Sequence, residues 1–296
     1  MSNNINQSDP STVSSLSRRA KAFPEALRDI PDPPEQIYIR GNLNDLLDRP
    51  RVAVVGSRSV TPYGRQVTEK LAGDLAERGV VIISGLAIGV DAIAHRSALD
   101  AGGLTIAVLP GPVESVYPAT NLRLADEILA KSGALLSEYS PGEGTHKHHF
   151  IARNRLVIGL AQAVLITEAA EKSGSLHTAR FALEQGKDVL AVPGNITSKT
   201  SVGTNNLIKA GATPITSYLD VLHALGLEDQ ATPKREVRGR NQHEQIVIDL
   251  LTDGISDGEQ LLKQSGLTTS EFNQAQTMLE IGGKVRPLSA NQWSLC

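Results

Sequence analysis

Short apolar runs alternate with helical stretches through most of this 296-residue chain. The run from Arg51 to Val55 ends at Gly56, and a helical stretch from about Pro62 to Arg78 stops at Gly79. A continuous apolar run is typical of a strand that is buried on both faces. Similar runs at 80–84, 104–109, 134–137, 163–167, 188–192 and 212–215 predict further strands. Repeated strand–helix units predict an α/β fold with an extended Rossmann-like parallel sheet and right-handed crossovers.

The pattern divides the chain into five segments. Residues 1–20 are rich in Ser and Asn and offer little apolar surface, so we expect a disordered tail. Residues 21–50 contain five prolines around Ile37-Tyr38-Ile39, which predicts an extended lead-in with one short strand. The α/β domain is expected at 51–226 and a basic linker at 227–241.

The last segment, 242–296, has a different pattern from the α/β domain. We expect one helix from about Gln245, a second that opens with the capping box of Ser256 and Glu259, and a third capped by Thr269 or Ser270. Two short strands that can pair as a hairpin follow. Three short helices and a two-stranded wing predict a C-terminal winged helix-turn-helix domain.

Bulk composition sets limits on the class of protein. The chain is 40% hydrophobic and 21% charged with a net charge of −3, which is ordinary for a globular protein of about two domains. The single cysteine, Cys296, excludes an intrachain disulfide and a cysteine-based metal cage. No run approaches the ~18 apolar residues of a membrane span, and the polar start of the chain does not resemble a secretory signal. We therefore expect a cytoplasmic protein that does not enter a membrane.

The segment 145–155 reverses the overall sign of charge. It carries Lys147, Arg153, Arg155 and three histidines, without a carboxylate, and it opens a predicted helix with Phe150. A basic run is often only a solvated face. Loops after parallel strands, however, are where such folds bind ligands, and helix N-termini favour anions. Together with the amide of Asn154, the segment points to phosphate.

Three other loops offer groups that suit an anion. Glycine lets backbone amides approach a phosphate, and a guanidinium matches phosphate oxygens with a fork of donors. Hydroxyls and amides at a helix N-terminus form a further anion cradle. The residues are Gly56, Ser57 and Arg58 after the first strand of the domain, Ser84 and Gly85 after the second, and Ser173, Gly174 and Ser175 after the fifth. A tight turn with a surface arginine is the plain alternative for the first of these loops.

The chain offers little support for familiar catalytic chemistry. Asp91 and His95 lie four residues apart and could share a helix face as an acid–base pair or a metal site, but two ligands are too few for a metal centre. A hydrogen bond from Asp91 at the start of the helix is the simpler expectation. No G-x-G-x-x-G follows the first strand, and neither a P-loop nor a G-x-S-x-G motif occurs. We therefore expect no cofactor and no activated nucleophile.

Eight motifs, taken in order, closely resemble the DprA/Smf family of DNA-processing proteins. The similarity covers about residues 35–225, and the C-terminal segment resembles the winged-helix domain of many members. The motifs are Gly56-Ser57-Arg58; Ser84-Gly85-Leu86-Ala87 with Gly89, Asp91, Ala94 and His95; Tyr117-Pro118 with Asn121 and Leu124; Ser137-Glu138-Tyr139; Phe150 with Arg153-Asn154-Arg155; Ser173-Gly174-Ser175 with Thr178-Ala179; Pro193-Gly194; and Gly203 with Asn205, Leu207-Ile208 and Gly211-Ala212.

The resemblance implies a function. Members bind single-stranded DNA, form dimers, protect incoming strands and load the RecA recombinase during natural transformation, and they are not enzymes. The positions matching the family's DNA pocket are Arg58, Lys147 and Phe150. An aromatic ring beside cations suits a single strand, because the ring stacks on bases while the cations contact phosphates. The sequence departs from the family pattern at Ile88, Ile151 and His177, which affects the pocket's detailed shape.

Two alternatives come from other functional classes. The first is a nucleotide-binding or nucleotide-hydrolysing enzyme related to the lysine-decarboxylase-like Rossmann proteins, but Pro193-Gly194-Asn195 does not continue as their motif does. The second is a sequence-specific regulator that uses the winged helix. Its recognition helix, Thr269 to Ile281, contains Glu271 and Glu280 without Lys or Arg, which is a poor surface for duplex phosphates.

Overall fold

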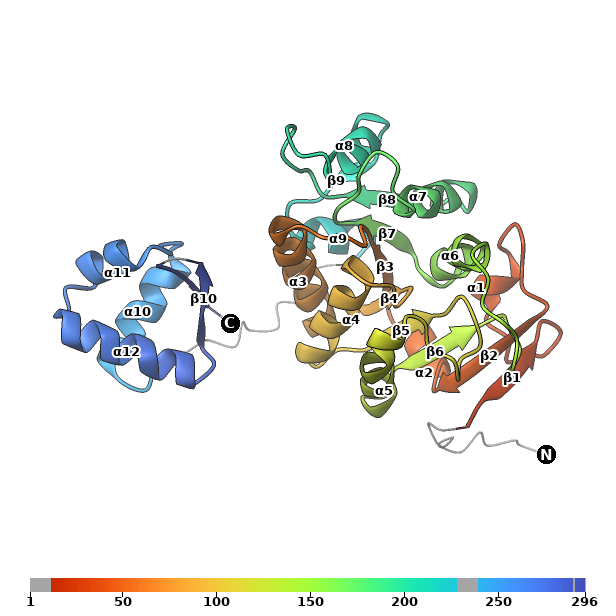
Figure 1. The fold of residues 1–296 in the computed structure, drawn as a ribbon, viewed down its shortest axis with the longest axis horizontal. Coiled ribbons are helices and arrows are strands. Elements are labelled where there is room, and N and C mark those ends of the chain that lie inside the picture. Colours follow the sequence, from red (N-terminus) through yellow and green to blue (C-terminus); the bar gives the residue numbers. More distant parts are fainter. Residues whose placement is uncertain (1–11, 228–238, 290, 296) are drawn as a thin grey trace. The chain divides into compact units, whose positions relative to one another are not determined.

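The computed structural model describes residues 12–227, 239–289 and 291–295. The chain forms two compact units, Met1–Gln230 and Ala231–Cys296, each considered by itself below. The first unit is built on a nine-stranded sheet in the order β1-β2-β6-β5-β4-β3-β7-β8-β9 (Figure 1). Its strands are β1 Ser14–Ser17, β2 Gln36–Gly41, β3 Arg51–Val55, β4 Val81–Ser84, β5 Thr105–Val108, β6 Ala134–Ser137, β7 Ala163–Ile166, β8 Asp188–Ala191 and β9 Thr213–Pro214.

The strands from β3 to β9 pair in parallel, as the repeated strand–helix pattern predicts. Every residue of β4, β5, β6 and β7 is buried, because helices cover both faces of the sheet. The helices are α1 Glu25–Arg28, α2 Asn44–Leu47, α3 Pro62–Glu77, α4 Val90–Asp100, α5 Leu122–Ala130, α6 His149–Leu160, α7 Ser175–Glu184, α8 Val202–Lys209 and α9 Tyr218–Ala224, with a 3₁₀ turn at Ala119–Asn121.

Two apolar cores flank the central strands. Side chains of α3, α4 and α9 pack against one face, and those of α1, α6 and α7 pack against the other. In Figure 1 the ribbons of α3 and α4 lie on one side of the central strands and that of α6 lies on the other. Between β3 and β7 the connections change direction along the sheet, since β4, β5 and β6 lie beyond β3 while β8 and β9 lie beyond β7. In open α/β sheets, this switch point leaves a crevice outside the carboxyl ends of the strands.

The start of the chain differs from the sequence prediction. The disordered tail predicted for 1–20 is wrong for Ser14–Ser17, which pair antiparallel with β2. The lead-in is more than an extended segment with one strand, because it also forms α1 and α2. β2 itself pairs antiparallel with β6, so the sheet is mixed. The polar residues of β1 are held through backbone hydrogen bonds, which apolar patterning does not reveal. Residues 1–11 and 228–238, part of the predicted tail and linker, lie outside the described residues.

The second unit contains three helices followed by a two-stranded antiparallel sheet. The elements are α10 Gln242–Thr252, α11 Gly258–Ser265, α12 Thr269–Ile281, β10 Val285–Ser289 and β11 Gln292–Leu295. Leu261, Phe272 and Leu279 are buried in a core of their own. The helix caps differ by one residue from those predicted: Asp257 caps α11, and Thr268 forms a capping box with Glu271 at the start of α12. Among the described residues, no helix combines the length and apolar character needed to cross a membrane.

Candidate functional site

A cavity of about 480 Å³ lies outside the carboxyl ends of β3, β4 and β7, between the N-terminal ends of α6 and α7. We call it the Arg58 pocket. Nine of the residues selected from the sequence line it: Gly56, Ser57, Arg58, Phe150, Arg153, Asn154, Ser173, Gly174 and Ser175. Its other lining residues are Val55, Ser59, Ala87, Asp91, Ile151, Ala170, Lys172 and Thr178. The fold therefore brings together loops that are far apart in the sequence.

Four of the selected residues do not line the Arg58 pocket: Ser84, Gly85, Lys147 and Arg155. The Ser84 hydroxyl is buried and donates to the carbonyl of Val54, over 2.6 Å. The Gly85 amide donates to a carboxylate oxygen of Asp91. Lys147 is exposed in the loop just ahead of α6. Ser84 and Gly85 therefore stabilise the backbone and the Asp91 side chain next to the pocket without lining it.

Arg153 is only 3% exposed and braces the floor of the Arg58 pocket. Its Nη1 donates to the carbonyl of Gly85 over 2.6 Å and to that of Val108, and its Nε donates to the Asn154 side chain. Burial lowers the pKa of Arg153 to about 10, although Asp91 opposes the shift, so the guanidinium stays charged at neutral pH. A Cβ at Gly85 would lie 2.3 Å from Arg153 Nη2, which explains why glycine is needed there.

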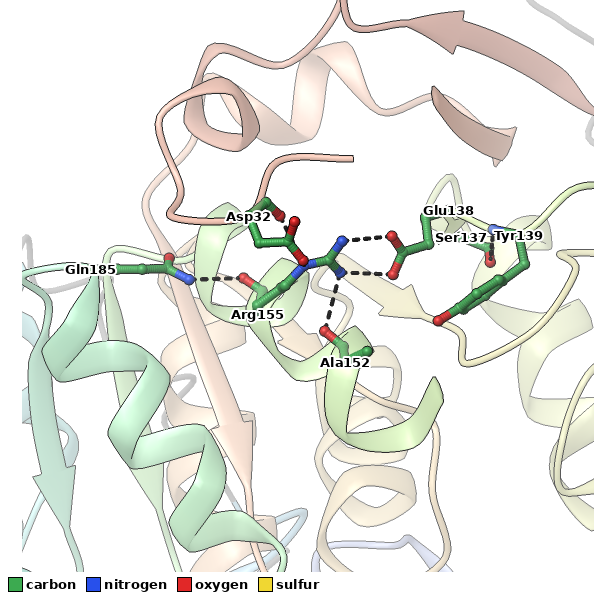
Figure 2. Close-up of polar contacts among 7 residues, drawn as sticks. All are labelled: Asp32, Ser137, Glu138, Tyr139, Ala152, Arg155 and Gln185. Atoms are coloured by element: carbon green, nitrogen blue, oxygen red, sulfur yellow. Dashed lines mark hydrogen bonds and ion pairs between the residues drawn. The ribbon is translucent and has the colours of Figure 1, made fainter. Parts of the chain in front are cut away.

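Arg155 does not line the Arg58 pocket. Its side chain connects α6 to Asp32 and Glu138 (Figure 2). Its two terminal nitrogens donate to the two carboxylate oxygens of Glu138 over 2.7 and 2.6 Å, and its Nε donates to Asp32 over 3.0 Å. Burial acts to lower the pKa of Arg155, but Glu138 and Asp32 outweigh it and raise the pKa. Arg155 is therefore placed as a structural ion-pair partner.

Arg58 and Phe150 form the open side of the pocket. The Arg58 guanidinium carbon lies 5.4 Å from the centre of the Phe150 ring, within cation–π range. Tyr117 meets the same ring edge-on, with centroids 5.3 Å apart and an interplanar angle of 79°. Tyr117 is 54% exposed, and Arg58 makes no ion pair with any described residue. A cation and two aromatic rings are therefore available to a ligand.

The N-terminal end of α7 forms the wall opposite α6. Ser173 and Ser175 share a hydrogen bond of 2.8 Å between their hydroxyls, just ahead of and within the first turn of the helix. The Asn154 amide donates to the Thr178 hydroxyl and joins the two helices. Lys172 also lines the pocket. It was not selected from the sequence, although it directly precedes Ser173. The wall combines a cation, hydroxyls and the positive end of a helix dipole.

Glu168 holds the loop that carries Arg58. This glutamate was not selected from the sequence either. Its backbone carbonyl accepts from the Ser57 amide over 2.8 Å. Its carboxylate accepts from the Thr61 amide and from the Thr61 hydroxyl, over 2.9 and 2.6 Å. A Cβ at Gly56 would lie 2.8 Å from the Glu168 carbonyl, so the close approach requires glycine. A single residue after β7 therefore fixes both ends of the Arg58 loop.

Asp91 and His95 do not form an acid–base pair with each other. One oxygen of Asp91 accepts from the Gly85 amide, while His95 Nδ1 lies 2.6 Å from the Thr105 hydroxyl. That hydroxyl donates to the Ile82 carbonyl, so the imidazole donates through Nδ1. Burial lowers the pKa of His95 to about 3 and raises the pKa of Asp91. In the described ranges, no three His, Cys, Asp or Glu side chains are grouped to hold a metal ion.

The histidines ahead of α6 pack with one another. His149 is buried, stacks on Tyr139 with ring centroids 3.9 Å apart, and has its Nδ1 3.2 Å from the Pro110 carbonyl. Burial, followed by the nearby His148, lowers the pKa of His149. His149 is therefore a packing residue at neutral pH and adds no positive charge to the segment.

Comparison with known proteins gives a consistent result. A family model described as DNA recombination-mediator protein A matches residues 14–226. The chain is 39% identical to the DNA processing protein DprA of Bacillus subtilis, over 72% of this chain and 71% of that protein. It is 46% identical to that of Streptococcus pneumoniae, over 68% and 70%. Protein Smf of Escherichia coli is 41% identical, over 69% of this chain and 54% of Smf.

Solved structures support the same assignment. The crystal structure of Streptococcus pneumoniae DprA has a TM-score of 0.67 and 44% identity, covering 72% of this chain and 74% of that chain. A Helicobacter pylori DNA processing protein A, described for its single-stranded DNA binding mode, has a TM-score of 0.65 and 38% identity, covering 72% and 95%. From this fold, these motifs and these relatives, the chain belongs to the DprA/Smf family of DNA-processing proteins.

Proposed function

We propose that this protein binds single-stranded DNA in the Arg58 pocket as a recombination mediator. The observation that carries the proposal is the contact of the Arg58 guanidinium with the Phe150 ring at the mouth of a cavity lined by Lys172 and the start of α7. Single-strand binding proteins combine such cations with aromatic rings on which bases stack. The Helicobacter pylori relative, which is described for its single-stranded DNA binding mode, supports the proposal.

The residues divide into two roles under this proposal. Arg58, Lys147 and Lys172 contact phosphates, and Phe150 stacks on a base. The Gly174 amide and a hydroxyl of the Ser173–Ser175 pair donate to the backbone of the strand, while Gly56 and Ser57 line the pocket beside it. Arg153, Asn154 and Arg155 support the pocket through hydrogen bonds to protein groups, as do Ser84 and Gly85. Only the first group is expected to change DNA affinity directly.

Removing the positive charge at Arg58 or Lys147 tests the proposal. We expect Arg58→Ala and Lys147→Ala each to weaken binding to oligo-dT by about tenfold at low salt, because each removes a charge-assisted hydrogen bond to phosphate. Each variant should also reduce the slope of log affinity against log salt by about 0.7 for every phosphate that the protein no longer neutralises. Fluorescence anisotropy of labelled oligo-dT over a salt series measures both quantities.

Lys70→Ala is the matched control, because it removes one positive charge from α3 outside the Arg58 pocket. Its affinity and salt slope should stay close to those of the unchanged protein. Unaltered oligo-dT affinity in both Arg58→Ala and Lys147→Ala would contradict the proposed function.

Replacing Phe150 separates stacking from charge. Phe150→Leu keeps an apolar side chain but removes the aromatic face. We therefore expect the binding free energy for oligo-dT to become less favourable by about 1–3 kcal/mol, with the salt slope unchanged. Phe150→Trp keeps a stacking surface and serves as the control. The same anisotropy titrations measure the effect, and equal affinities for the Leu and Trp variants would show that no base stacks at Phe150.

We further propose the wider role that the family resemblance implies: a cytoplasmic homodimer, without catalytic activity, that protects incoming strands and loads RecA recombinase during natural transformation. The support is the 39–46% identity to proteins named DprA and Smf. RecA filament assembly on single strands coated with single-strand-binding protein should be faster when this protein is added. No observation favours a nucleotide-hydrolysing enzyme, and release of free base from nucleotide monophosphates would revive that alternative.

For the C-terminal unit we propose a winged-helix domain at 242–296, after a linker at 227–241. The order of α10, α11, α12 and the β10–β11 pair supports this assignment. Glu271 caps α12 through Thr268, and no Lys or Arg lies in the helix, so we do not expect α12 to bind duplex phosphates. A stable shift of duplex DNA by residues 241–296 alone would contradict this expectation.

A further inference from the structure

A second cavity, of about 590 Å³, lies on the other side of the loop that carries Arg58. It is formed by the start of α3, the end of β7 and the segment after β8. We call it the Glu168 pocket and define it by Thr61, Tyr63, Glu168, Pro193, Asn195 and Ser198. It shares no lining residue with the Arg58 pocket, so the proposed DNA site does not account for it.

The carboxylate of Glu168 is the charged group of this cavity. The residue is 2% exposed, and its two oxygens accept hydrogen bonds from the amide and hydroxyl of Thr61. A carboxylate has about four lone-pair positions, so it retains capacity for further donors. A Cβ at Gly64 would lie 2.4 Å from a Glu168 oxygen, which shows how closely α3 approaches the group. A ligand that donates hydrogen bonds would compensate the buried charge further.

The other residues that line the Glu168 pocket are uncharged. Tyr63 is 46% exposed, and its hydroxyl donates to the Pro193 carbonyl over 2.7 Å. Burial, and then the charge of Glu168, raises the pKa of Tyr63, so the hydroxyl remains a donor at neutral pH. Pro62 and Pro193 add apolar surface, and Asn195 and Ser198 add polar groups. Among the described residues, no Lys, Arg or His lines this cavity, so it offers no cation to a phosphate.

The position of the cavity also favours a ligand site. It lies at the carboxyl ends of β3, β7 and β8, beside the point where the strand order reverses. Open α/β sheets bind ligands in this crevice, and an acidic side chain at such an edge can accept from sugar hydroxyls. The volume falls within the ~300–1,000 Å³ typical of small-molecule sites.

We propose that the Glu168 pocket binds the uncharged part of a nucleoside. A sugar hydroxyl or a base amino group donates to Glu168, while the base lies against the apolar surfaces of Tyr63 and the prolines. The ligand is either a free nucleoside or a nucleoside of the strand that passes through the Arg58 pocket. The recognition chemistry is the same in both cases and does not depend on the proposed DNA site.

Equilibrium dialysis of the full chain with labelled 2′-deoxyadenosine tests the proposal. We expect saturable binding, and binding of the 5′-monophosphate weaker by about tenfold, because its charge meets Glu168 without a cation nearby. Ser198→Leu, at a partly exposed position, should fill the cavity and abolish binding. Glu168→Gln should weaken binding by about tenfold, since hydrogen bonds to a charged acceptor are the stronger ones. Circular dichroism of each variant checks that it folds.

Competition identifies the source of the nucleoside. If a nucleoside of the bound strand occupies the pocket, oligo-dT displaces deoxyadenosine from the unchanged protein, and Arg58→Ala needs about tenfold more oligo-dT for the same displacement. If the pocket takes a free nucleoside, both ligands bind together. Either result supports the site. Absence of saturable deoxyadenosine binding by the folded protein, or unchanged binding in folded Ser198→Leu, would overturn it, whether or not the protein binds single strands.

Discussion

Replacing Arg153 with methionine is expected to lower the free energy of unfolding of the first unit by about 3–5 kcal/mol, because removing one member of a buried charged network leaves the others uncompensated. Arg153 is buried and donates to the carbonyls of Gly85 and Val108, and it offsets the buried carboxylate of Asp91. Methionine fills similar space but supplies no donor. Urea unfolding followed by far-UV circular dichroism measures the change.

Two controls sharpen this measurement. Arg58→Met alters an exposed guanidinium in the same cavity and should change stability by less than about 0.5 kcal/mol. The only tryptophan, Trp293, lies in the second unit, so its fluorescence should report an unfolding transition that Arg153→Met does not change. An Arg153→Met protein as stable as the unchanged chain would show that the guanidinium is not a structural brace.

The second large effect is expected at Arg155. Arg155→Met leaves the partly buried carboxylate of Glu138 without the paired hydrogen bonds of 2.7 and 2.6 Å that now satisfy it (Figure 2). We expect the free energy of unfolding to fall by about 3–5 kcal/mol. The double variant Arg155→Met with Glu138→Leu removes both charges and should recover a large part of this stability, because no unpaired carboxylate remains.

Asp32 provides the matched comparison, because it contacts the same guanidinium from a side chain that is 81% exposed. Asp32→Ala should cost less than about 1 kcal/mol, as exposed ion pairs usually do. A loss of stability in the double variant equal to the sum of the losses in Arg155→Met and Glu138→Leu alone would mean that Glu138 and Arg155 are not energetically coupled. The urea measurement described for Arg153 applies to all of these variants.

The parallel strands of the sheet could be predicted because burial on both faces leaves a continuous apolar run. The edge strands could not. β1 is a run of three serines and one leucine, and it joins the sheet through backbone pairing with β2. The prolines of the lead-in predict an extended segment, yet Leu27 of α1 is fully buried in the core that α6 also joins. The pattern of apolar residues along the chain indicates which side chains are buried, but it does not indicate which strands pair through their backbones.

The candidate site shows a similar division. Phe150, Arg153 and Asn154 are spaced i, i+3 and i+4 on α6, so they share the face that lines the Arg58 pocket. Arg155 is two positions from Arg153 and therefore points elsewhere, which helical spacing alone would have indicated. Charge and motif position indicated the right helix but not the direction of each side chain. Nothing in the local pattern marks Glu168, whereas Lys172 could have been found because it directly precedes the selected Ser173.

The double attachment of the Arg58 loop to Glu168 bears on how fast a ligand can bind. The Ser57 amide and the Thr61 amide and hydroxyl are all held by this residue before any ligand arrives. The conformational entropy of ordering the loop is therefore lost during folding and does not oppose association. Capture of a strand at Arg58 should proceed as a single second-order step, with a rate that depends on ionic strength through steering rather than on a slow rearrangement of the protein.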